Sequence, residues 1–214
     1  MDSFVVDFAD GTRRAPAPVV YLRQHDVDLM NVRAVILSHL HADHCRGIDE
    51  VVLACSDARF YLPAAVPDAV CREIVKIGVP TENRLALDEI ATAYRYASDD
   101  DRFRTAAAVA VVHQSTDCLR AIGPSQRAVQ AAREPLAEND LAGTRRVLDK
   151  NFTSIVVLVL AGAAVALLGA DMDAEADLGW PRLLVEHAGL DWIGGIGLVK
   201  VAHHGSETAH HAEM

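Results

Sequence analysis

Val35-Ile36-Leu37-Ser38-His39-Leu40-His41-Ala42-Asp43-His44 places four potential metal ligands within six residues, directly after an apolar run. The apolar run predicts a buried strand over residues 32–38. A strand that ends in a loop releases the alternation of its side chains, so several imidazoles and a carboxylate can turn toward one point. Histidines are also common on surfaces, and a polar turn after a strand requires no function. Three histidines and one aspartate at this density favour a metal site over that alternative.

These ligand-type residues are spaced as His-x-His-x-Asp-His. At every defined position the spacing resembles the signature of the metallo-β-lactamase superfamily of metal-dependent hydrolases. The resemblance implies an α/β (α+β) chain folded as a four-layer αββα sandwich. It also implies two adjacent metal sites, the first served by His39 and His41 and the second by Asp43 and His44.

Length and composition set the class of protein. With 214 residues, 51% of them hydrophobic and 23% charged, we expect a globular chain with a single domain over residues 1–214. The formal charge of −10 argues against tight nucleic-acid binding, because phosphate contacts need a basic surface. Bound divalent ions would reverse the sign locally, so a small or short phosphorylated substrate stays compatible with this charge.

The four cysteines show neither Cys-x-x-Cys spacing nor a dense framework, so we expect reduced thiols in the cytoplasm. Cys45, beside His44, is predicted to be a small buried side chain rather than a ligand. The first residues lack the basic region and apolar core of a signal peptide. The longest apolar run, residues 155–168, is shorter than the roughly 17–20 residues of a membrane helix and has Gly162 at its middle, so two buried strands are expected there.

The rest of the chain alternates between strand and helix patterns, which is typical of an α/β fold. Further strands are predicted at residues 4–8, 59–63, 106–113, 118–122 and 196–201, and helices at 19–25, 47–55, 65–77, 125–135 and 174–189. Pro135 is expected to end or kink its helix, and the last helix is expected to be kinked or restarted near Pro181. Residues 80–103 give no clear pattern. Compared with the family that the chain resembles, the fold looks abbreviated at both ends, so self-association through open sheet edges is expected.

Two further strands are expected to end in ligand-type residues. Asp171 follows the second apolar strand, and His203-His204-Gly205-Ser206 follows the strand at 196–201. A lone aspartate after a strand is usually a helix cap, and a His-His pair in a loop is usually a surface feature. Together with the first motif, and in this order, they predict one site assembled from distant parts of the sequence.

Within the superfamily, the arrangement is most similar to the branch that includes the soluble domain of the ComEC-type competence proteins. The similarity lies in Asn151-x-x-Ser154-Ile155-Val156, in Leu167-Leu168-Gly169-Ala170-Asp171, and in Lys200-Val201-Ala202-His203-His204-Gly205-Ser206. It implies that Asp171 bridges two metals and that His203 completes the second site. His204, as a catalytic residue, and Ser206 and Asn151, as substrate-binding residues, would contact a phosphate or leaving group.

One feature departs from the wider superfamily. No histidine in a Gly-His-Thr context stands between the first motif and Asp171; His113, the only histidine in that interval, is expected on a strand or turn surface. Asn151 occupies the comparable place in the competence-type branch. The first metal site would then have two histidines, Asp171 and water, a set that suits zinc or manganese.

The resemblance therefore implies hydrolysis by a metal-activated water, with Asp43 orienting the water and accepting its proton. A phosphodiester or related phosphorylated substrate is preferred because of the His-His-Gly-Ser loop. Two alternatives stay open: a lactone, thioester or other carboxylic ester hydrolysed at the same site, and a non-catalytic binding module that a metal stabilises. No membrane partner is expected.

Overall fold

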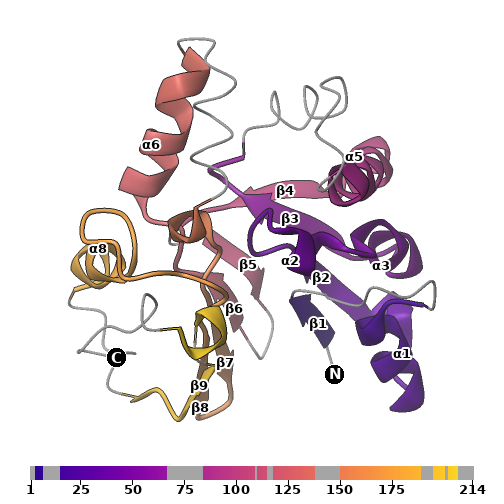
Figure 1. Cartoon of the computed structure of the whole chain (residues 1–214). Helices are drawn as coiled ribbons and strands as arrows, with labels where there is room; N and C mark the ends of the chain where they lie inside the picture. The colour runs from indigo at the N-terminus through magenta and orange to yellow at the C-terminus, as the bar shows by residue number, and fades with distance from the viewer. Residues whose placement is uncertain are drawn as a thin grey trace. The chain divides into compact units, whose positions relative to one another are not determined.

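The computed structural model describes residues 3–6, 15–66, 84–108, 110–114, 118–137, 150–188, 195–200 and 202–206. The chain divides into two compact units (Figure 1). Unit 1 comprises Met1–Leu62 and Val66–Thr105, and unit 2 comprises Pro63–Ala65 and Ala106–Met214. Each unit holds one sheet with its own helices. The expected single domain over the whole chain stays a prediction.

Unit 1 is built on a four-stranded sheet in the order β1-β2-β3-β4, made of Ser3–Val6, Val32–Ile36, Arg59–Pro63 and Phe103–Ala106. β2 pairs in parallel with β1 and with β3, with Val35 opposite Val5 and Phe60. A strand between two parallel neighbours is buried on both faces, which explains the nearly continuous apolar run of β2. The carboxyl ends of these strands meet at one edge of the sheet, where the His-rich loop begins.

The helices of unit 1 are α1, α2, α3 and α5, with a 3₁₀ turn η1, at Ala17–Gln24, Ala42–Cys45, Ile48–Ala54, Arg84–Asp99 and Leu29–Asn31. α1 and α3 confirm predicted helices. α5 lies within residues 80–103, which show no clear pattern in the sequence; it buries Ile90, Ala93 and Ala97. α5 packs against α3, and Figure 1 shows the two helices side by side. Of the helix predicted at 65–77, Ala65 and Val66 lie in a turn, and the other residues lie outside the described ranges.

Unit 2 is built on a five-stranded sheet in the order β5-β6-β7-β8-β9, made of Ala110–Gln114, Cys118–Ala121, Val157–Ala161, Ala164–Leu168 and Leu198–Lys200. β7 and β8 form a hairpin in which Ala161 pairs with Ala164, and Gly162 takes a positive φ of 57° in the two-residue turn. The two strands predicted around Gly162 are thus confirmed, but the expected burial holds only in part: Val157 and Leu158 are buried in β7, and Leu167 is the buried residue of β8. The strand predicted at 106–113 begins later than expected: β4 ends at Ala106, and β5 spans Ala110–Gln114.

β8 and β9 are the one parallel pair of the sheet, with Leu168 opposite Lys200. Their carboxyl ends therefore lie together, and the segments that carry Asp171 and the His203-His204 pair leave the sheet side by side.

The helices of unit 2 are α6 and α8, with the 3₁₀ turns η2 and η4, at Gln126–Ala137, Trp180–Glu186, Asn151–Thr153 and His203–Gly205. α6 continues through Pro135, which was expected to end or kink it. The helix predicted at 174–189 is shorter, because turns occupy residues 176–178 before α8 begins at Trp180. A buried apolar cluster that includes Phe152, Met172, Trp180 and Leu183 forms the core of this unit.

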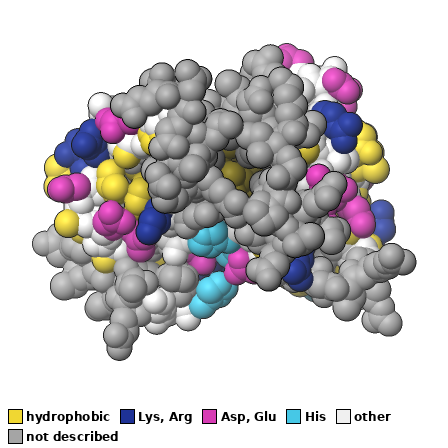
Figure 2. Space-filling model, turned by 45° about the horizontal axis from the view of Figure 1, so that its top comes forward, with side chains coloured by type: hydrophobic (Ala, Val, Ile, Leu, Met, Phe, Trp, Pro, Cys, Tyr) yellow, Lys and Arg dark blue, Asp and Glu magenta, His cyan; other side chains and the backbone are white. Residues whose placement is uncertain are grey.

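The observed class agrees with the expectation of a mixed α/β chain, with two sheets and helices. In the described part of the chain, no helix has the length and apolar character needed to cross a membrane. Cys45 and Cys55 are buried thiols, and burial raises the pKa of Cys55 to about 11. Figure 2 shows one face of the molecule, on which the described Lys and Arg side chains are scattered among Asp and Glu.

Candidate metal centre

His39 lies in the segment that continues β2 beyond its last residue. The Leu37 N–H donates to the carbonyl of Tyr61 at 3.0 Å, so the chain still follows β3 at this point. The side chains of Ser38 and His39 are fully buried, and the Ser38 Oγ lies 3.0 Å from His39 Nδ1. A hydroxyl that accepts the Nδ1–H of an imidazole leaves the Nε2 lone pair for a metal, which is the usual arrangement of a metal-binding histidine.

The other three residues of the motif lie on α2 or at its start. His41 is the N-cap residue of α2, and its carbonyl accepts the N–H groups of His44 and Cys45 at 3.0 and 3.1 Å. The ring of His39 lies 4.5 Å from that of His41 and 4.2 Å from that of His44, measured between centroids. The structure therefore brings the three predicted imidazoles together within unit 1.

Asp43 sits at the exposed side of this cluster. Its side chain is 59% exposed, and its Oδ2 lies 3.6 Å from the Nε2 of His44, which is nearly buried. Cys45 is fully buried, and its thiol donates to the carbonyl of His39 at 3.7 Å. The cysteine thus supports the backbone of the motif, in agreement with the small buried side chain that the sequence predicted.

Unit 2 contributes a second group of ligand-type residues after β8. The Gly169 N–H donates to the carbonyl of Lys200 at 3.3 Å, and Ala170 takes a positive φ of 49°. Added side-chain atoms at Gly169 would meet Ala202 and Trp180 at 3.0 and 3.2 Å, so the close packing here needs glycine.

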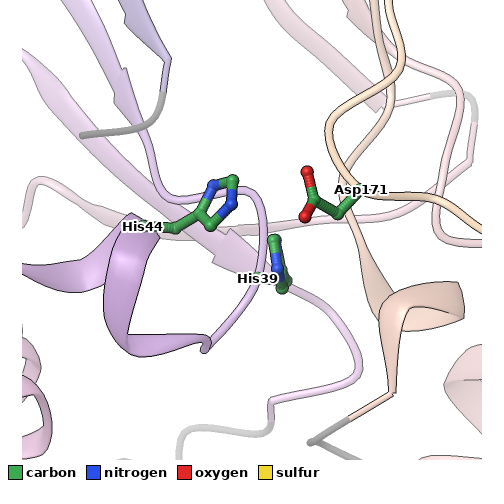
Figure 3. A group of neighbouring side chains, drawn as sticks. All are labelled: His39, His44 and Asp171. Carbon is green, nitrogen blue, oxygen red and sulfur yellow. The ribbon is translucent and has the colours of Figure 1, made fainter. Parts of the chain in front are cut away.

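Asp171 directly follows the tight turn at Gly169 and Ala170, and it is only 2% exposed. The Nε2 of His204 lies 3.6 Å from Asp171 Oδ2, and the His204 side chain is 69% exposed. Figure 3 labels Asp171 on its loop, together with His39 and His44 of unit 1. A carboxylate withdrawn from water requires a compensating positive charge, such as a cation.

The remaining predicted site residues are described only in part. His203 belongs to η4, but its side chain is not among those that the structure describes. Ser206 is half-buried, and the Asn151 carbonyl, in η2, accepts the Ser154 N–H at 2.9 Å. His113 is half-buried on β5. The substrate-binding roles of Ser206 and Asn151 stay predictions.

The donor chemistry of both groups fits a divalent metal. Imidazole nitrogens and carboxylate oxygens together suit Zn²⁺ and Mn²⁺. Unit 1 offers three imidazoles with one carboxylate, and unit 2 offers a buried carboxylate beside an imidazole.

Two supporting residues escaped the sequence analysis. Ser38 is adjacent to the motif, so its contact with His39 could have been suspected from the order of residues. Glu89 lies 42 residues from Gly47, to whose N–H its carboxylate binds, on a helix that was not predicted. No local signal in the sequence marks that contact.

Comparison with known proteins assigns the chain to a family. Residues 5–134, more than half of the chain, match the family described as "Beta-lactamase superfamily domain". The chain therefore belongs to the metallo-β-lactamase superfamily, a family of hydrolases. No curated protein matches the chain.

Two solved structures are similar to it. The first is a "hydrolase AbOPH in beta lactamase superfamily", with 13% identity, 79% of this chain and 52% of that chain covered, and a TM-score of 0.46. The second is the "metallo-beta-lactamase fold protein YhfI from Bacillus subtilis", with 15% identity, 80% and 51% covered, and a TM-score of 0.37. The chain spans about half the length of each.

The family match contains the motif from His39 to His44 but ends before Asp171 and His204. The assignment of those two residues therefore rests on their position after β8 and β9 and on their chemistry.

Proposed function

We propose that the chain is a metal-dependent hydrolase with a centre for up to two divalent ions. The proposed ligands come from both units: His39, His41, Asp43, His44, Asp171 and His203. The observation that carries the proposal is the cluster of three imidazoles, in which the ring centroids of His44 and His41 lie 4.2 and 4.5 Å from that of His39. Neutral imidazoles that share one side of a loop present several lone pairs to the same space, which suits a metal ion.

Zinc is the preferred ion, and manganese is the alternative because carboxylates make up part of the donor set. When bound, the ions would polarise a substrate oxygen and lower the pKa of a bound water. The chain's own groups would do the rest. Asp43, exposed beside His44, would accept the proton of the attacking water on its Oδ atoms and fix the direction of attack.

His204 would act on the leaving group. Its exposed ring next to the buried Asp171 carboxylate can hold a proton on Nε2 and donate it to a departing oxygen. Ser206 and Asn151 would hold the substrate by hydrogen bonds.

A phosphodiester or related phosphorylated compound is the proposed substrate. The similarity to the ComEC-type branch, carried by the His203-His204-Gly205-Ser206 loop, supports this choice. The formal charge of −10 and the scattered cations of Figure 2 favour a small or short substrate over a long nucleic acid. A lactone, thioester or other carboxylic ester is the alternative substrate for the same residues.

The proposal is tested by metal analysis of the purified protein together with a panel of chromogenic phosphodiester, lactone, thioester and β-lactam substrates. We expect bound zinc or manganese, turnover of the phosphodiester, and loss of turnover with a chelator. Turnover that resists the chelator would contradict metal dependence. Efficient β-lactam cleavage without phosphodiester cleavage would contradict the proposed substrate.

A paired set of variants separates an enzyme from a binding module. The double change His39→Ala and His41→Ala should abolish metal binding and reduce turnover to background while circular dichroism still reports a folded chain. His25→Ala is the matched control, because His25 is an exposed histidine of the same unit whose ring contacts that of Tyr21 at a tilted angle. Metal binding without turnover of any substrate in the parent protein would favour the binding module.

A further inference from the structure

A side chain of helix α5, that of Glu89, contacts the backbone shortly after the His-rich motif. The Oε2 of Glu89 accepts the N–H of Gly47 at 2.6 Å, and the contact is half-buried. A short hydrogen bond to an ionised carboxylate is about twice as strong as one between neutral groups. Both residues belong to unit 1.

Gly47 is the corner between the helix that carries Asp43 and His44 and the next helix. α2 ends at Cys45, α3 begins at Ile48, and Gly47 takes a left-handed φ of 80°. A change in the backbone at this corner would rotate α2 relative to α3. Fixing the Gly47 N–H therefore fixes the direction in which the last residues of α2 point.

α2 needs such an anchor because it has only four residues. A helix this short is unstable in isolation, since its nucleation cost is not recovered by internal hydrogen bonds. α5 packs against both α2 and α3, so it can hold the corner as a rigid support.

The surroundings of the Glu89 carboxylate disfavour its charged form, which lowers the stability of the fold. Burial raises the pKa of Glu89, the hydrogen bond from Gly47 lowers it, the acidic side chains of Asp49 and Glu50 raise it, and Arg46 lowers it. A half-buried acid held near two other acids costs folding free energy. Such an arrangement is typical of a residue retained for function.

We propose that Glu89 is a positioning residue of the metal centre, which holds α2 through Gly47 so that Asp43 and His44 are oriented toward the ion. The inference rests on the proposed function. Glu89 touches neither metal nor substrate; it acts through the backbone, as the outer partners of metal ligands do.

Three substitutions at Glu89 test whether the length of its side chain or its charge is needed to hold the Gly47 N–H. Glu89→Gln keeps an oxygen acceptor at the same reach without the charge. Glu89→Asp keeps the charge but shortens the side chain by one methylene group. Glu89→Ala removes both. Asp88→Asn is the matched control, because Asp88 is the adjacent exposed acid of α5 and its neutralisation leaves the Gly47 contact intact.

The measurement is the affinity for Zn²⁺ and for Mn²⁺ by titration calorimetry, below the melting temperature of each variant. We expect Glu89→Ala and Glu89→Asp to weaken binding by about tenfold or more, the range found when outer partners of ligands are lost. Glu89→Gln and Asp88→Asn should stay within a factor of about three. Ile90→Val, which trims the buried core of the same helix, should lower the melting temperature without weakening metal binding, which excludes a merely structural effect.

Unchanged affinity in Glu89→Asp and Glu89→Ala would overturn the inference while leaving the proposed function intact. The same holds if Glu89→Gln binds weakly and Glu89→Asp binds normally, since charge rather than reach would then matter. A parent protein that binds neither ion would refute the proposed function, and the inference with it.

Discussion

His39 and Asp171 are two buried residues of the proposed metal centre. His39 is fully buried with the Ser38 hydroxyl at its Nδ1, and Asp171 is buried by the turn at Gly169 and Ala170. Burying an imidazole and a carboxylate sacrifices their hydration, and the loss is recovered only when something else binds their polar atoms. The backbone beside Asp171 is strained, because Ala170 lies in a left-handed conformation that disfavours any residue with a side chain.

Gly47 offers a direct test at the scale of one residue. Gly47→Ala should lower the free energy of unfolding by about 1–2 kcal/mol, since a left-handed φ of 80° strains any residue with a Cβ. The new Cβ would also meet the Cγ of Pro16 at 3.1 Å. Urea denaturation measures the change. Gly195→Ala is the control, because no atom lies near a Cβ there and its φ is not left-handed; equal effects of the two substitutions would contradict the argument.

The ligand-type residues of the motif can be recognised in the sequence because they lie within six residues, so their chemistry is visible without knowledge of the fold; their role as metal ligands stays a prediction. The anchoring contact of Glu89 could not be predicted in this way, because it joins residues 42 positions apart. His41 and Asp43 were predicted as ligands by pattern alone, and the structure adds that one begins α2 and the other is exposed beside His44.

At the scale of elements, the main helix that the sequence pattern did not predict is α5, and its buried alanines explain why. α5 buries Ile90, Ala93 and Ala97 at three- and four-residue spacing, which is a helical pattern, but alanine gives a weak apolar signal. By contrast, the run around Gly162, rich in β-branched residues, was predicted as two strands joined at this glycine, and the structure pairs them as an antiparallel hairpin. The start of the predicted helix at 174–189 was placed too early, because turns hold these residues until Trp180.

The start of α6 supports a prediction at this scale. The Ser125 Oγ accepts the N–H of Ala128 at 3.0 Å and donates to the carbonyl of Leu178 at 3.0 Å, so it caps the helix and fixes a loop. Ser125→Ala should lower the free energy of unfolding by about 1–2 kcal/mol, because it leaves a helix N–H and a carbonyl without their partner. Thermal or urea unfolding reports the change.

Ser56→Ala is the matched control for this substitution. The Ser56 side chain is exposed and contacts only the sulfur of Met30 among the partners that the structure gives it, at 3.4 Å, so a change within about 0.5 kcal/mol is expected. If Ser125→Ala is as mild as this control, the cap contributes no more to stability than an exposed hydroxyl.

At the scale of the whole molecule, the proposed ligands are distributed over both units. The family match covers the ligand-type residues of unit 1, whereas Asp171 and His204 lie beyond residue 134. Both residues follow the end of a strand, as the sequence predicted, and β8 and β9 are parallel neighbours. Their role as part of one centre with the motif of unit 1 stays a prediction.

A metal held by ligands from both units should stabilise the chain as a whole. An ion that binds only the folded state adds about 2.7 kcal/mol at a hundredfold excess over its dissociation constant. For a chain of this size, that corresponds to a rise in melting temperature of about 5–10 °C. We therefore expect a chelator to lower the melting temperature by this amount, and added zinc to restore it.

The pattern of unfolding distinguishes a shared centre from one confined to unit 1. If both units supply ligands, calorimetry should show one transition with metal, and Asp171→Asn should reduce the chelator-sensitive part of the melting temperature as strongly as the double change at His39 and His41. His25→Ala should retain the full effect of the chelator. If Asp171→Asn leaves that effect unchanged, unit 1 alone holds the ion, and the proposal that the two units build one centre is wrong.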